Sequence, residues 1–182
     1  MVDIVPDRAR KGRGAIGNPT NRFDSAQRVA TDDGWSDAAG DPDDFMPPLR
    51  TTVGIDSSRS IIARNDSPDI PFLQSINPYR GCEHGCVYCY ARPSHGYLGL
   101  SSGLDFETKL FAKPDAARLL EAELRRPGYT PSAIALGTNT DPYQPVERGH
   151  RITRQILAVL AAFNHPFTIV TKSALVVRDL DL

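Results

Sequence analysis

The residues best suited to chemistry are three cysteines, Cys82, Cys86 and Cys89, which form a C-x3-C-x2-C run. They are the only cysteines in the sequence, and their number is odd. A secreted disulfide scaffold usually has an even number, whereas clustered cysteines in a reducing compartment indicate metal or redox chemistry. Because thiolates are soft ligands that suit iron–sulfur clusters and zinc, the run predicts a metal centre.

The number of thiols favours a cluster with one open position. A [4Fe–4S] cluster usually takes four cysteines, so a set of three leaves one iron free to bind a chelating group from outside the protein. Gly85 allows the loop to wrap closely around a cluster. Zinc is the alternative, with His84 as the fourth ligand of a Cys3His set. Structural zinc sites usually combine two ligand pairs, and no second pair is present.

The elements that position the cysteines alternate between strands and amphipathic helices. We expect strands or extended segments at 51–53, 60–63, 72–79, 105–111, 133–137 and 166–170, with helices at 113–126 and 151–163. Ser173 is the predicted cap of a further helix. This alternation indicates βα units and a parallel sheet, the α/β class. In such sheets functional loops follow the carboxyl ends of strands, so the cysteine loop and the loops 138–141 and 171–173 are expected on one face.

Composition sets the remaining boundaries. The chain has 182 residues and a net charge of −1, without the strongly basic footprint of a dedicated nucleic-acid binder. Residues 1–48 are rich in glycine and proline and predict a disordered leader. No apolar run approaches the roughly 18 residues of a membrane span, and no signal peptide is evident, so a cytoplasmic protein without membrane contact is expected.

The cysteine run, with Tyr88 just before its last cysteine, resembles the signature of the radical S-adenosylmethionine superfamily. Wider stretches are similar to proteins related to spore photoproduct lyase, often labelled DNA repair photolyase-like. These stretches are Asn77 to Cys82, Cys89 to Pro93, Gly137 to Pro145, Thr171 to Ser173 and Lys11 to Ala15. The resemblance runs from about residue 11 to the last residue.

The resemblance implies a lyase-like radical enzyme. Cys82, Cys86 and Cys89 would hold a [4Fe–4S] cluster whose open iron binds S-adenosylmethionine. Reduction would then break S-adenosylmethionine into methionine and a 5′-deoxyadenosyl radical, which takes a hydrogen from the substrate. Such a cofactor carries the difficult chemistry while the protein positions it. An electron donor such as flavodoxin or ferredoxin is the implied partner.

The resemblance also implies contacts to the cofactor. Tyr88 would lie near the adenine or the cluster, and Lys172 would pair with the methionine carboxylate. The methionine amino group would meet the loop that follows the strand at 133–137. The residues of that loop are Gly137, Thr138, Asn139, Thr140 and Asp141.

In fold, the resemblance implies the N-terminal half of a (β/α)6 partial barrel over residues 76–182, after the leader and a pre-barrel segment at 49–75. Only about three βα units are evident, so we expect an incomplete fragment, inactive alone, or a barrel that a second chain completes. The substrate is unknown, and a nucleic acid lesion is a guess from family analogy alone. A non-enzymatic zinc-binding interaction module remains the alternative function.

Overall fold

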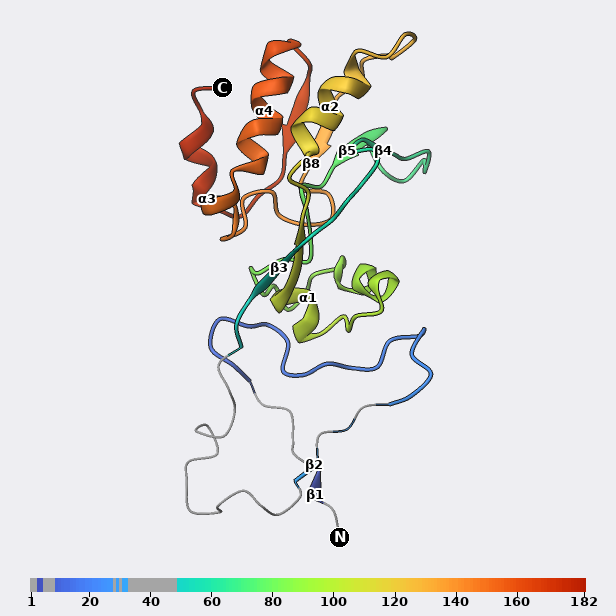
Figure 1. The fold of residues 1–182 in the computed structure, drawn as a ribbon, viewed down its shortest axis with the longest axis vertical. Coiled ribbons are helices and arrows are strands. Elements are labelled where there is room, and N and C mark those ends of the chain that lie inside the picture. The colour runs from blue at the N-terminus through green and yellow to red at the C-terminus, as the bar shows by residue number, and fades with distance from the viewer. Residues whose placement is uncertain (1–2, 5–8, 28, 30, 33–48) are drawn as a thin grey trace.

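The computed structural model describes residues 3–4, 9–27, 29, 31–32 and 49–182, and it mixes helices with strands in the predicted α/β manner (Figure 1). Its sheets have four, three and two strands, and none of them closes into a barrel within the described residues. No helix in the described part of the chain is long and apolar enough to cross a membrane.

The four-stranded sheet has the order β4-β5-β8-β9. Its strands are β4 (Ala63–Arg64), β5 (Gln74–Ile76), β8 (Ile134–Leu136) and β9 (Phe167–Ile169). The last three are parallel, as the sequence predicts, whereas β4 runs antiparallel to β5. The carboxyl ends of three parallel strands therefore meet at one edge of the sheet and feed the loops expected to be functional.

Two helices pack against each other and against this sheet: α2 (Ala116–Leu124) and α4 (Ile152–Ala162). Leu120 on α2 and Ile156 and Leu160 on α4 are fully buried at helical spacing, which is the stripe that the sequence predicts. Both helices are confirmed, one to three residues shorter at each end than expected. Two shorter elements lie in the same half of the chain. Helix α3 (Glu147–His150) directly precedes α4, and the 3-10 helix η2 (Ala174–Asp179) comes after β9.

The cap of η2 is confirmed. The hydroxyl oxygen of Ser173 accepts the backbone N–H of Leu175 at 3.3 Å, as an N-cap serine does. The element itself is a 3-10 helix.

A three-stranded sheet lies closer to the cysteines, with the order β3-β7-β6. Its strands are β3 (Thr52–Ile55), β7 (Lys109–Ala112) and β6 (Tyr79–Arg80). The single strand predicted at 72–79 is thus two strands in two sheets, β5 and β6. The chain changes sheets at Pro78, which has no N–H to continue a ladder. Two further strands, β1 (Asp3–Ile4) and β2 (Thr31–Asp32), form an antiparallel pair.

The segment 105–111 corrects one expectation, because its first part is helical and not extended. Helix α1 (Leu104–Thr108) precedes β7. Two acceptors from the expected leader bind its first N–H groups: the Gly17 carbonyl takes Leu104 N at 3.0 Å, and Asn18 Oδ1 takes Asp105 N at 2.8 Å. A five-residue helix capped by such distant residues has no local periodicity to reveal it.

The segment that precedes α1 is also partly helical. A 3-10 helix, η1 (Arg92–Leu98), occupies its first half. Pro93 suits the first turn of that helix. Gly99, at φ 68°, ends it in the left-handed conformation that glycine adopts readily.

Candidate functional site

The cysteine loop follows β6 directly and turns on two glycines, Gly81 at φ 73° and Gly85 at φ 61°. Cys82 is buried, and its backbone N–H donates to the Phe106 carbonyl at 2.9 Å. Cys86 and Cys89 are half-buried, and all three thiols are free. The structure therefore presents the predicted ligands on one short turn anchored to α1.

Lys172, in the loop after β9, reaches the cysteine loop. Its Nζ donates to the His84 carbonyl at 3.3 Å, and the neighbouring Cys86 sulfur raises the pKa of Lys172. Burial raises the pKa of the Cys82 thiol to about 11. A cation therefore stands beside thiols, one of which stays protonated at neutral pH until a ligand displaces its proton.

Asp141 joins the loop after β8 to the loop after β9. Its carboxylate accepts the Thr171 hydroxyl at 2.7 Å, Lys172 N at 3.0 Å and Tyr143 N at 2.8 Å. His84 Nε2 lies 3.3 Å from its Oδ2. Burial alone would raise the pKa of Asp141, but its polar contacts, led by those with His84 and Thr171, outweigh burial and lower it. Three donors therefore use acceptor sites of this carboxylate, and the His84 ring stands at ion-pair distance from it.

The rest of the loop 137–141 is fixed to strand ends. Gly137 has φ 87°, and a Cβ there would lie 2.1 Å from the Val170 carbonyl oxygen, so β8 and β9 approach too closely for a side chain. Asn77 Oδ1 accepts Asn139 N at 2.9 Å and Thr140 N at 3.3 Å. The Thr140 hydroxyl donates to the buried Tyr79 carbonyl at 2.8 Å.

Two aromatic residues flank the last cysteine. The Tyr90 hydroxyl donates to the Thr138 carbonyl, which ties the cysteine loop to the loop after β8. Tyr88 is 82 % exposed at the outer edge of the cysteine loop. The fold therefore encloses little of the Tyr88 side chain.

Part of the expected leader packs against the cysteine loop. The buried carboxylate of Glu107 accepts the backbone N–H groups of Gly14 and Ala15, at 3.1 and 2.9 Å, and pairs with Arg92. Arg92 in turn donates to the Cys86 carbonyl at 2.9 Å. Residues 9–27, the blue segment beside α1, thereby hold the cysteine loop from one side (Figure 1).

Gly14 makes the tightest contact of this segment. A Cβ on Gly14 would lie 2.1 Å from the Gly85 carbonyl oxygen, so only glycine fits between the leader and the cysteine loop. The glycine-rich run 11–15 was the available signal for this contact. The domain boundary expected at residue 48 stays a prediction, and residues 33–48 lie outside the described part of the chain.

The donor set fits a soft metal centre in its chemistry: three free thiols lie on one turn with a lysine beside them. No group of three or more His, Cys, Asp or Glu among the described residues is arranged to hold a metal ion. His84, the alternative fourth ligand for zinc, directs Nε2 toward Asp141. That buried nitrogen lies 3.3 Å from the Asp141 carboxylate but makes no hydrogen bond within the described residues.

A cavity of about 520 Å³ adjoins this turn. Its walls come from the leader, from η1, from the end of the cysteine loop and from the loop after β8. The lining residues are Thr20, Asn21, Arg22, Phe23, Tyr90, Ala91, Pro93, Ser94, Gly96, Tyr97, Ser102 and Asn139. The volume falls in the range typical of small-molecule sites.

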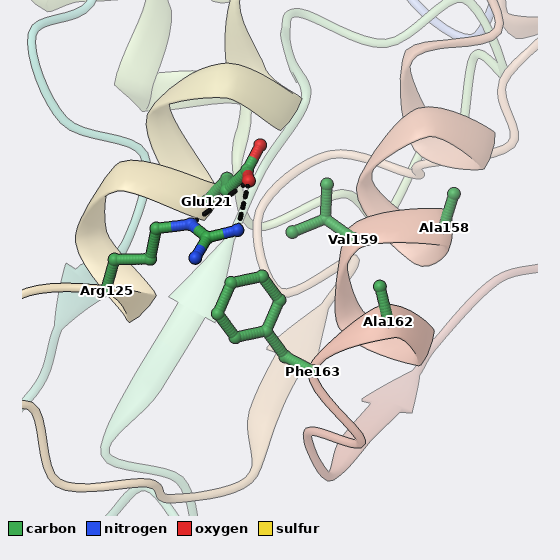
Figure 2. Close-up of a pocket in the computed structure, with 6 residues that line it drawn as sticks. All are labelled: Glu121, Arg125, Ala158, Val159, Ala162 and Phe163. Carbon is green, nitrogen blue, oxygen red and sulfur yellow. Dashed lines mark hydrogen bonds and ion pairs between the residues drawn. The ribbon is translucent and has the colours of Figure 1, made fainter.

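A second cavity, of about 450 Å³, lies between α2 and α4 (Figure 2). On the α2 side of this cavity, Arg125 donates a hydrogen bond to the Glu121 carboxylate. The Arg125 guanidinium also lies 5.2 Å above the centre of the Phe163 ring. The carboxyl ends of both helices lead to the amino ends of β8 and β9. This cavity is therefore at the sheet edge opposite the cysteine loop.

Comparisons with known proteins give relatives without an assigned function. The chain is 47% identical over 113 residues to uncharacterised proteins of Mycobacterium tuberculosis and Mycobacterium bovis, which covers 62% of this chain and 33% of each relative. It is 33% identical over 107 residues to an uncharacterised protein of Methanocaldococcus jannaschii, covering 59% and 38%. No family model and no solved structure matches. The chain thus spans about a third of the length of the curated relatives it matches.

Proposed function

We propose that this chain is the cluster-binding part of a radical S-adenosylmethionine enzyme of the spore photoproduct lyase-related type. The observation that carries the proposal is the meeting of three sequence-distant loops. Lys172 from the loop after β9 donates to the His84 carbonyl between Cys82 and Cys86, while Asp141 from the loop after β8 pairs with His84. An isolated zinc turn would need neither partner loop.

The donor set suggests the division of labour. Cys82, Cys86 and Cys89 would hold a [4Fe–4S] cluster, which when bound and reduced supplies the electron that cleaves S-adenosylmethionine. Lys172 would bind the carboxylate of that cofactor by a charge-assisted hydrogen bond. Asp141 would act as a positioning residue, since its acceptor sites are used inside the protein.

In the loop after β8, the backbone of residues 137–139 would line the cofactor. Asn77 and Tyr90 bind this backbone and fix its shape. Thr140 turns its hydroxyl inward to Tyr79 and would support the loop from behind.

The rest of the enzyme would lie outside this chain. The three parallel strands β5, β8 and β9 with α2 and α4 are compatible with the beginning of a (β/α)6 partial barrel. The remaining walls would come from further sequence or from a second chain. An electron donor such as flavodoxin or ferredoxin is the proposed partner, and the whole protein's substrate is a matter for experiment.

Anaerobic reconstitution with iron and sulfide tests the proposal. We expect a brown protein with about four irons per chain, whose visible absorption dithionite bleaches. S-adenosylmethionine should then perturb the electron paramagnetic resonance spectrum of the reduced protein, a readout that does not need turnover. A chain that binds one zinc tightly and takes up no iron and sulfide would overturn the proposal and favour the zinc module.

A further inference from the structure

The cavity beside the cysteine turn has one wall that belongs to none of the predicted cofactor contacts. That wall is the leader residue Arg22 with the rings of Phe23 and Tyr97. The same cavity is also lined by Tyr90, the neighbour of Cys89, and by Asn139 from the loop after β8. A molecule in the cavity would therefore lie next to the cysteine turn while also touching groups outside the predicted cofactor contacts.

Arg22 is held in place by aromatic rings and not by a carboxylate. Its guanidinium carbon lies 4.7 Å from the centre of the Phe23 ring and 5.6 Å from that of Tyr97, and Nη2 donates to the Tyr97 hydroxyl at 3.0 Å. The two rings lie 5.6 Å apart. Within the described residues, the printed contacts of Arg22 are with the two rings and the Tyr97 hydroxyl. A stacked guanidinium of this kind keeps N–H donors for planar anionic groups.

The rings themselves are open to solvent. Phe23 is 56% exposed, Tyr97 70% and Tyr90 77%. Exposed aromatic rings around a cavity are unusual on a surface that binds nothing, and they offer stacking faces to a flat ring. The polar groups between them, such as Asn139, can fix orientation by hydrogen bonds.

We propose that this cavity binds the substrate, and that the substrate is a small anionic molecule with a flat ring and a phosphate or carboxylate group. Arg22 binds the anionic group, and the rings of Phe23, Tyr97 and Tyr90 enclose the flat part. Only the identification of the ligand as a substrate rests on the proposed function. The binding site itself stands on the contacts of Arg22.

The test uses phenyl phosphate as the probe on the full chain before any iron is added. Isothermal titration should show saturable binding of one equivalent, with phenol and inorganic phosphate each weaker. We expect R22Q to weaken phenyl phosphate by about tenfold, since one charge-assisted contact is lost. The matched control R118Q, an exposed arginine on α2 paired with Asp115, should bind as the parent chain does.

Further ligands test which anionic group the site prefers and whether the ligand is a small molecule, a polymer or the cofactor. Benzoate in place of phenyl phosphate distinguishes carboxylate from phosphate recognition, and either preference supports the site. Single-stranded oligothymidylate that binds over tenfold more tightly than phenyl phosphate, in an Arg22-dependent way, would overturn a small substrate in favour of a polymer. Displacement of phenyl phosphate by S-adenosylmethionine would assign the cavity to the cofactor.

Equal affinity of R22Q and the parent chain would also overturn the proposal, provided that thermal unfolding shows both to be folded. Y97F, which keeps the ring and removes only the hydroxyl bonded to Arg22, should weaken the probe less than R22Q. Because no iron is present, these results do not depend on cluster assembly. If reconstitution fails but Arg22-dependent binding holds, the proposed function falls and the binding site remains.

Discussion

The carboxylate of Glu107 accepts the backbone N–H of Gly14 at 3.1 Å, across 93 residues of sequence. The same carboxylate pairs with Arg92, which holds the carbonyl of Cys86. A glycine of the leader is therefore coupled to the cysteine turn through one buried acid. Because an unpaired buried charge is strongly destabilising, neither side of this contact can be lost without effect on the other.

Substitution of Gly14 by alanine should loosen the cysteine turn. The added Cβ would meet the Gly85 carbonyl oxygen at 2.1 Å, and backbone on both sides must shift. We expect a loss of about 1–3 kcal/mol in the free energy of unfolding, measured by urea denaturation, together with reduced iron uptake. G149A is the matched control, because a Cβ there meets nothing within 4 Å and alanine favours helix α3. Equal losses in both variants would contradict this contact.

Each single replacement of Cys82, Cys86 or Cys89 by alanine should abolish iron incorporation. A cluster with two remaining protein ligands is not retained. Iron and sulfide analysis after anaerobic reconstitution measures the effect. V87A removes an exposed side chain from the same turn and should keep its full iron content. A cysteine variant with undiminished iron would remove that residue from the ligand set.

Asp141→Asn should separate the loops after β8 and β9. An amide oxygen can replace only part of a carboxylate that accepts from Thr171, Lys172 and Tyr143, and its NH2 group faces donors. We expect a loss of about 1–3 kcal/mol in unfolding free energy. D115N, which breaks an exposed pair with Arg118, should change it by less than about 0.5 kcal/mol.

Acid should weaken the attachment of η2. Burial alone would raise the pKa of Asp179, but hydrogen bonds from Arg178 and Arg154 outweigh burial and lower it to about 2. The folded pKa lies below the ordinary value of 3.8, so this stabilisation is complete above about pH 4 and disappears as the pH falls toward 2.

Urea unfolding between pH 7 and pH 2.5 measures this dependence. The D179N variant should be less stable at pH 7 and should lose less stability between pH 4 and 2.5 than the parent chain. Parallel curves for the two proteins would show that another carboxylate controls acid unfolding.

The local sequence pattern was sufficient to predict an element where that element buries its own regularly spaced apolar residues. Helix α4 and strands β8 and β9 lie where apolar spacing predicts them, and the capping role of Ser173 follows from its type and place. Helix α1 was missed because its first N–H groups are satisfied by Gly17 and Asn18, which no local pattern connects to it.

The sequence by itself determined the thiols and their spacing, the α/β alternation and the polar loops that follow β8 and β9. Tertiary structure decided which groups contact the cysteine loop: Lys172 and Asp141 at His84, and Gly14 against Gly85. The physical reason is the range of the forces concerned. Periodicity and capping act within a few residues, whereas hydrogen bonds of a buried carboxylate join whatever segments the packed sheet brings within about 3 Å.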